Sequence, residues 1–357
     1  MNVDNRLDVI DGLRGLAIFA VIYQHAYAAA LIKLTREHGV MPQPYLMGNG
    51  WMGVSLFFIL SGFVLSLPYF AGKRSMVSGD DVTNFYIRRA NRLMPLFLIA
   101  AALCCVVVSR GGDLKIKSLL LTISTLSMFT RSEFFPTING PFWSVGLEIW
   151  FSLLFPLILF SALRFGLYRI AIAVFCLSII ARFAGANFAF MNVHVNPVKD
   201  SVIARIDDFV VGVLLASLYA KGRFNRMPSW CGMTGVAVVL LACYLWDRRL
   251  YHGISAINTV YFNNLSQVGF ALIIAVCLNG SGALASVIRL WPLRILGAMC
   301  YSLYCWHALL VSGGMAQNPF SVLEMAKYWF LLLGLSFLSY RYIEFPRTSS
   351  WRELLRL

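Results

Sequence analysis

One apolar stretch near the start of the chain holds two ionisable residues, Arg14 and His25. They are eleven positions apart, so in an α-helix they lie within about 20° of one face and are separated by roughly 16 Å, half the thickness of a bilayer core. Ionisable groups inside a span are costly and usually functional. The pair therefore predicts one wall of an internal polar pathway. The alternatives are an arginine that snorkels to the headgroups and a histidine satisfied by a neighbouring helix.

Three further arginines, Arg88, Arg89 and Arg92, follow the second apolar segment. Their spacing places Arg88 and Arg92 on one helical face, with Arg89 beside it. Guanidinium groups pair well with phosphate oxygens. The cluster predicts a site for a phosphorylated donor at a membrane entrance, and headgroup anchoring is the alternative.

Other polar residues lie inside later apolar segments. Glu148 follows Ser144 by one turn, and a buried carboxylate needs a partner or a proton. We expect it to orient His25 or to pair with an arginine. A second intramembrane histidine, His307, lies among aromatic residues.

A charged group opens another apolar segment, where Arg205 is followed by Asp207 and Asp208. At the non-cytoplasmic end of a span, such residues are typical of a boundary cluster. The alternative is a polar gate or a binding site for the acceptor.

The composition excludes an ordinary soluble domain. The chain is 59% hydrophobic and only 13% charged, whereas soluble domains carry about 25% charged residues. The net charge of +14 comes from Lys and Arg spread among short loops, which favours topology determination and contact with anionic lipids over nucleic-acid binding. The eight cysteines form no CxxC pair, so we expect neither a metal site nor a disulfide framework.

Hydropathy predicts an all-α integral membrane protein with about ten transmembrane helices in a single domain, residues 1–357. The segment 114–130 is a candidate eleventh helix, which would be either interfacial or re-entrant. The distribution of Lys and Arg favours cytoplasmic termini. The expected spans are 12–32, 52–70, 95–109, 141–163, 168–186, 202–220, 229–246, 264–280, 293–313 and 324–343.

The motifs, taken in order, resemble the acyltransferase-3 family of bacterial integral membrane acyltransferases over nearly the whole chain. The residues that carry the resemblance are Asp11-Gly12-Leu13-Arg14-Gly15 with His25, Phe57 to Phe63, Arg88-Arg89-Ala90-Asn91-Arg92, Trp143-Ser144 with Glu148, Arg205 with Asp207, and Ser302-Leu303-Tyr304 with Trp306-His307.

The resemblance implies transfer of an acyl group, usually acetyl, from cytoplasmic acyl-coenzyme A to a hydroxyl of a glycan or glycan-like acceptor. Family members in the bacterial inner membrane modify lipopolysaccharide O-antigen, peptidoglycan, exopolysaccharide, Nod factors or macrolides. Some carry an additional extracytoplasmic hydrolase-like domain. The sequence stops at Leu357 without one, so we expect direct transfer onto a lipid-linked or soluble sugar rather than peptidoglycan.

A mechanism follows as an expectation. His25 acts as general base, Glu148 orients it, and no metal is required. The coenzyme A phosphates bind Arg88, Arg89 and Arg92, with help from Arg14. The residues expected to contact the substrate are Trp143, Ser144, Arg205, Asp207 and His307.

Three other interpretations remain open. A proton-coupled transporter also uses intramembrane Arg, His and Glu, although it more often shows broken, repeated helices. A non-catalytic scaffold would tolerate loss of His25. Within the family, the donor could be succinyl or a longer acyl group, and the acceptor a small glycosylated molecule.

Overall fold

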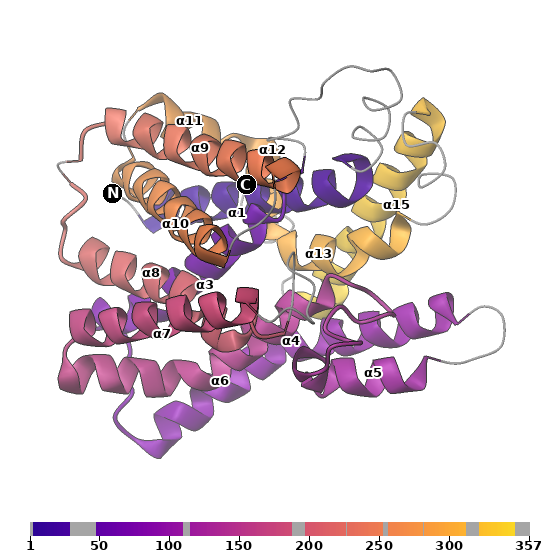
Figure 1. Cartoon of the computed structure of the whole chain (residues 1–357), viewed down its shortest axis with the longest axis horizontal. Helices are drawn as coiled ribbons and strands as arrows, with labels where there is room; N and C mark the ends of the chain where they lie inside the picture. Colours follow the sequence, from indigo (N-terminus) through magenta and orange to yellow (C-terminus); the bar gives the residue numbers. More distant parts are fainter. Residues whose placement is uncertain are drawn as a thin grey trace.

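The computed structural model describes residues 3–28, 48–109, 115–187, 197–225, 227–252, 256–280, 282–311 and 321–346. Within these ranges every regular element is helical and there is no strand (Figure 1). The predicted all-α class is confirmed. Parts of two predicted spans, residues 29–32 and 312–313, lie outside the described ranges.

The described chain consists of helices and short helical turns. In chain order they are α1 (Val3–Tyr23), α3 (Met52–Phe70), α4 (Gly79–Val108), α5 (Ile116–Ile123), α6 (Phe142–Phe165), α7 (Leu167–Asn187), α8 (Val202–Ala220), α9 (Trp230–His252), α10 (Ala256–Asn279), α11 (Ala283–Ile288), α12 (Trp291–Ala298), α13 (Cys300–Leu310) and α15 (Val322–Ser339). Three short turns join them: the π-helical η1 (Gln24–Ala28) and η4 (Tyr340–Glu344), and the 3₁₀ turn η3 (Leu126–Phe129).

Six helices of the described chain are long and apolar enough to cross a membrane, and a seventh span results if the bent pair α12 and α13 is counted as one. The protein is therefore a multi-pass membrane protein, but the predicted count of about ten is not confirmed. Two predicted spans, α1 and α8, carry more charged residues than an isolated span tolerates. The apolar part of α9 is shorter than a full span.

The doubtful segment 114–130 forms the short helix α5 and the turn η3, separated by Thr125 at a φ of 59°. Eight helical residues rise about 12 Å, less than half of a bilayer core. This segment therefore does not cross the membrane as a helix. It packs against α4 and α6.

The arginine cluster lies on a longer helix than the sequence indicated. The predicted span 95–109 is the second half of α4, which has 30 residues. A capping box starts the helix: the Asp81 N–H donates to Ser78 Oγ, and the Ser78 N–H donates to the Asp81 carboxylate, both at 3.1 Å. One continuous helix thus carries the arginines and the membrane segment.

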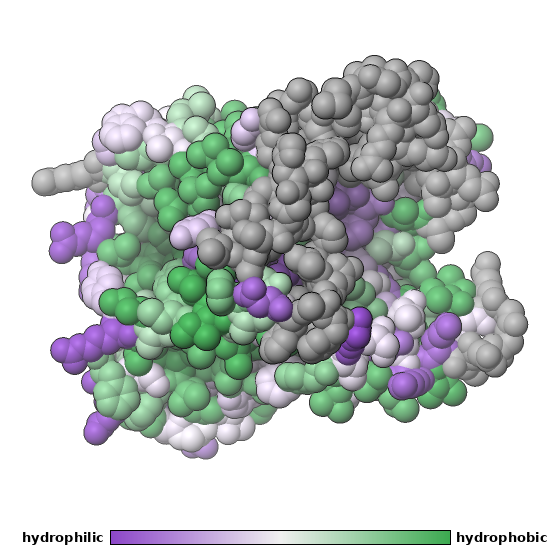
Figure 2. Space-filling model, in the orientation of Figure 1, coloured by the Kyte–Doolittle hydropathy of each residue, from purple (hydrophilic) through white to green (hydrophobic). Residues whose placement is uncertain are grey.

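Figure 1 shows α4 to α7 along one side of the molecule and α9 to α11 along the other. Two clusters of buried apolar residues hold these sides together, and α1, α3 and α8 contribute side chains to both clusters. These three helices therefore form the centre of the bundle. On the face shown in Figure 2, apolar side chains form a broad area left of centre, and several strongly hydrophilic side chains project at the left edge.

Close helix crossings depend on glycine. Helices α3 and α8 meet where Gly62 lies against the backbone of Phe209 and Gly212 lies against the backbone of Ile59. A Cβ at either glycine would meet backbone atoms, which cannot move aside as a flexible side chain can. Small residues at such crossings let two backbones approach closely.

We predict that Gly62→Ala destabilises the protein by about 1–3 kcal/mol, because the added methyl group overpacks this crossing. The measurement is thermal unfolding of the detergent-purified protein. Gly334→Ala on α15 is the matched control, since a Cβ there meets nothing within 4 Å. Equal unfolding temperatures for the two variants would contradict the close crossing.

Candidate functional site

A cavity of about 130 Å³ lies between α1, α3, α4, α6 and α13. Since a cavity needs roughly 10–15 Å³ for each water, it has room for on the order of ten water-sized groups. Its lining residues are Arg14, Val54, Phe57, Phe58, Ser61, Arg89, Arg92, Leu93, Ser144, Val145, Glu148, Cys300, Tyr301 and Tyr304.

Glu148 and Arg89 form an ion pair at one level of the cavity. Ser61 donates a hydrogen bond of 2.6 Å to the Glu148 carboxylate. The Arg89 Nε–H donates to Ser152 Oγ at 3.1 Å. Of the two roles expected for Glu148, the structure thus shows pairing with an arginine.

Arg92 forms an ion pair with Glu344, whose carboxylate also accepts a hydrogen bond from Ser302. The Arg92 guanidinium lies over the rings of Tyr301 and Phe345, 5.1 to 5.8 Å from their centroids. Glu344 belongs to η4, so the end of the described chain closes this side of the cavity. Glu344 is not among the candidate site residues of the sequence analysis.

The third cavity arginine, Arg14, has a carboxylate within reach as well: its guanidinium is 3.9 Å from Asp11.

The predicted arginine cluster is divided. Arg89 and Arg92 line the cavity, whereas Arg88 is exposed. The face shared in the structure is therefore that of Arg89 and Arg92, three positions apart.

A second level of the cavity lies at Ser144, one helical turn before Glu148 on α6. Here Ser144 Oγ and Tyr304 Oη are 2.5 Å apart, and the Tyr304 hydroxyl donates to the Pro141 carbonyl at 3.0 Å. The Phe57 ring meets the Tyr304 ring edge-on, with centroids 6.2 Å apart. Trp143, a tentative substrate contact, does not line the cavity and packs against aromatic rings of the loop before α6.

The two intramembrane histidines meet one turn beyond Tyr304. The rings of His25 and His307 have centroids 4.9 Å apart and are steeply inclined. His307 is fully buried and also packs against Tyr304, whereas His25 is exposed. Three polar groups therefore follow one another along the bundle: the arginine–carboxylate pairs, the two hydroxyls of Ser144 and Tyr304, and the two histidines.

Each histidine has one ring nitrogen next to a backbone carbonyl. His25 Nδ1 lies 2.9 Å from the Val21 oxygen, and His307 Nδ1 lies 2.7 Å from the Tyr304 oxygen. Because a carbonyl oxygen only accepts hydrogen bonds, these contacts assign the proton of each neutral ring to Nδ1. The Nε2 lone pairs then remain available, and His307 Nε2 is buried without a hydrogen-bond partner.

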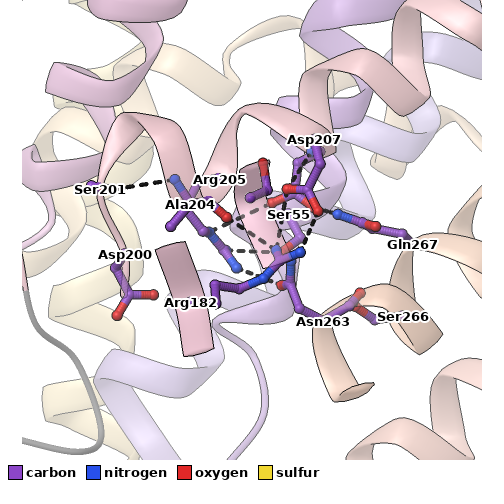
Figure 3. A network of polar contacts seen from close by, with 12 residues as sticks. Ser55, Arg182, Asp200, Ser201, Ala204, Arg205, Asp207, Asn263, Ser266 and Gln267 are labelled. Carbon is purple, nitrogen blue, oxygen red and sulfur yellow. Dashed lines mark hydrogen bonds and ion pairs between the residues drawn. The ribbon is translucent and has the colours of Figure 1, made fainter. Parts of the chain in front are cut away.

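Arg205 and Asp207 lie in a different place, in a buried polar network between α3, α7, α8 and α10 (Figure 3). Asp207 pairs with Arg182 of α7 through contacts of 2.5 and 3.2 Å. Arg205 donates to Ser55 of α3 at 3.0 Å. Neither Arg205 nor Asp207 lines the cavity.

Asp208 belongs to the same network. Its carboxylate is 3.5 Å from Arg205 and accepts a hydrogen bond of 2.8 Å from Gln267 of α10. These charges are buried inside the bundle, in the first two turns of α8. Sequence reasoning also missed Arg182, although an arginine within an apolar helix is a signal for a buried acidic partner.

Comparison with known proteins identifies the same family that the sequence motifs resemble. The acyltransferase-3 family, described as an acyltransferase domain, matches residues 7–343. The chain belongs to this family. No solved structure matches it.

Two relatives come from Gram-positive bacteria. YrhL of Bacillus subtilis (strain 168), whose name provisionally assigns it to peptidoglycan O-acetylation, is 25% identical over 97% of this chain and 56% of its own length. O-acetyltransferase OatA of Staphylococcus aureus (strain NCTC 8325 / PS 47) is 24% identical over 94% of this chain and 56% of its own length. The chain therefore spans about half the length of these relatives.

We predict that Asp207→Asn lowers the free energy of unfolding by about 3–5 kcal/mol, because Arg182 then keeps a buried charge without its partner. Thermal unfolding in detergent measures this loss, and Arg182→Met combined with Asp207→Leu should recover part of it. An Asp207→Asn protein with normal stability and no activity would instead place this residue at a ligand.

Proposed function

We propose that the protein is a membrane O-acetyltransferase that moves an acetyl group from cytoplasmic acetyl-coenzyme A to a hydroxyl of an exported glycan. The observation that carries this proposal is a cavity lined by arginines and by Tyr304, whose ring packs against His307 of the histidine pair. Arginines suit an anionic donor, and a neutral imidazole with a free Nε2 suits a general base. Membership of an acyltransferase family supports the same reaction.

The reaction would proceed at the histidine end of the cavity. The acceptor oxygen attacks the thioester carbon while His25 Nε2 takes the hydroxyl proton. The carbon–sulfur bond then breaks, and the imidazolium returns the proton to the thiolate. The transient oxyanion needs a hydrogen-bond donor, and the hydroxyls of Ser144 and Tyr304 are the nearest candidates.

The arginine end would bind the coenzyme A part of the donor. Glu148 supports this role indirectly, since its pairing with Arg89 holds that side chain at the cavity. His25 is exposed and would face the acceptor, and the buried His307 would support it from inside the bundle. Arg205 and Asp207 would stabilise the bundle around the site.

The acceptor is proposed to be a glycan such as O-antigen, exopolysaccharide or peptidoglycan. The relative YrhL is named for peptidoglycan, and OatA is named an O-acetyltransferase. The proposed setting is the bacterial inner membrane, with about ten spans, both termini in the cytoplasm and a single domain over residues 1–357.

We predict that His25→Ala lowers acetyl transfer at least 100-fold, the usual contribution of a positioned base. Membranes with matched amounts of protein are supplied with radiolabelled acetyl-coenzyme A, and label in the glycan fraction is counted. Arg14→Ala should also reduce labelling, whereas Arg169→Ala, an exposed arginine at the start of α7, is the control.

Transfer by His25→Ala at the wild-type rate would remove this histidine from the chemistry. A wild-type protein that labels no glycan, in membranes known to contain acceptors, would contradict the transferase and favour a transporter.

A further inference from the structure

The histidine pair lacks the carboxylate that commonly accompanies a histidine base. In a Ser-His-Asp arrangement, the aspartate orients the imidazole and stabilises the positive charge that the ring gains. Glu148, the residue expected to orient His25, pairs instead with Arg89. Among the described residues, neither His25 nor His307 lies within ion-pair distance of a carboxylate. A positive charge on His25 therefore needs stabilisation from another group.

His307 is the side chain in ring contact with His25. The two ring centroids are 4.9 Å apart, and the ring planes are inclined by 67°. His307 also packs against the Tyr304 ring, with centroids 5.3 Å apart, and its backbone carbonyl accepts a hydrogen bond of 3.3 Å from the Tyr328 hydroxyl of α15. Helices α13 and α15 thus fix His307 beside the base.

The buried position of His307 favours a neutral ring. The residue has no exposed surface, and a charge there without a carboxylate partner would lose its hydration without compensation. The Nδ1–H of His307 donates to the Tyr304 carbonyl at 2.7 Å, which leaves the lone pair on Nε2. His307 is therefore a fixed dipole whose negative end is Nε2.

This lone pair is a hydrogen-bond acceptor held in place without a donor. Nε2 of His307 is buried and has no hydrogen-bond partner among the described residues. A buried acceptor without a donor costs free energy in the resting protein, and a catalytic role is one reason why such a group persists. Of the two rings that contact His307, those of Tyr304 and His25, only His25 gains a positive charge in the proposed reaction.

We propose that His307 is a positioning residue for the base His25, and that the Nε2 lone pair of the neutral His307 stabilises the positive charge on His25 during acetyl transfer. This inference rests on the proposed function. An interaction that becomes favourable only as charge develops lowers the barrier of the chemical step. Because His307 is already fixed by its neighbours, the dipole needs no reorganisation at that moment.

The proposed step balances in atoms and charge. The acceptor oxygen bonds to the thioester carbon as its proton moves to His25 Nε2, and the carbon–sulfur bond breaks. His25 then returns the proton to the thiolate of coenzyme A. His307 neither gains nor loses a proton. Its removal should therefore lower kcat and leave the KM for acetyl-coenzyme A unchanged.

We predict that His307→Phe lowers kcat for transfer to the glycan about tenfold, the loss of one interaction with a charged group. Phenylalanine keeps a ring beside His25 but has no lone pair. His307→Gln, whose amide oxygen can replace the Nε2 acceptor, should recover most of the rate. Tyr328→Phe is the matched control, because it removes a hydrogen bond to the backbone of His307 and leaves the imidazole in place.

Three kinetic results would overturn the inference. In the first, His307→Phe has the kcat of the wild type. In the second, His307→Phe and His307→Gln lose the same activity, which would make His307 a packing residue. In the third, the KM for acetyl-coenzyme A rises while kcat is unchanged, which would place His307 at the donor.

Nitrogen NMR of protein labelled with ¹⁵N-histidine in nanodiscs tests the same contact without turnover. The chain has five histidines, and His25→Ala and His307→Phe assign the two rings. When acid protonates His25, the Nε2 signal of His307 should shift while its ring stays neutral, and His25→Ala should abolish this shift. An Nε2 signal that does not respond to His25 would overturn the inference and assign the lone pair to a buried water.

The two measurements together separate this inference from the proposed function. If the wild type transfers acetyl while His307→Phe keeps its kcat and the Nε2 signal ignores His25, the inference is wrong and the function stands. If the Nε2 signal responds to His25 but the wild type transfers no acetyl, the transferase fails and the stabilisation of His25 by His307 stands.

Discussion

A charged side chain inside an apolar bundle needs an opposite charge, and this requirement organises the whole structure. The low dielectric makes an isolated buried charge cost several kcal/mol, whereas a pair with further hydrogen bonds is tolerated. Here Arg89, Arg92 and Arg182 each meet a carboxylate from another helix. Helices that are far apart in the chain are held in register by these contacts.

The ion pairs have different roles in the two places where they occur. Around Arg182 and Arg205 the network is buried and amide side chains from α10 complete it, so it joins helices. Around Arg89 and Arg92 the pairs border a cavity, and guanidinium N–H groups remain available to a ligand. Charge pairing thus stabilises the bundle around Arg182 and forms a polar wall at the cavity.

The histidine pair depends on the cavity walls. His307 is fixed by its Nδ1–H hydrogen bond to Tyr304, whose hydroxyl contacts Ser144 at the inner end of the cavity. His25 belongs to η1, where α1 changes to a π-helical turn, a feature often found at functional sites. A donor lying along the cavity would therefore reach the histidines only by passing the two hydroxyls.

The sequence predicted the class, the family and five of the residues that line the cavity, namely Arg14, Arg89, Arg92, Ser144 and Glu148. The 59% hydrophobic content required membrane helices, and the spacing of Arg14 and His25 indicated one interior wall. In the structure Arg14 lines the cavity beside residues of α13, and His25 meets His307 of the same helix. Local pattern placed Arg14 at the cavity, whereas His25 lies in the π-helical turn after α1 and does not line the cavity.

Pairings between distant helices could not be predicted in the same way. Arg92 and Glu344 are 252 positions apart, and no local pattern relates them. The division between Arg88 and Arg89 depends on which face of α4 is buried, which tertiary packing decides. The number of spans was also uncertain, because charges in α1 and α8 are compensated only by neighbouring helices.

The central claim, that the cavity holds the acyl donor beside the histidine pair, is tested most directly by a structure. The measurement is electron cryomicroscopy of the protein in nanodiscs with a thioether analogue of acetyl-coenzyme A. The account predicts the acyl carbon beside His25 Nε2 and the coenzyme A part of the donor at the cavity arginines. An acyl group remote from His25, or a donor bound outside the cavity, would contradict it.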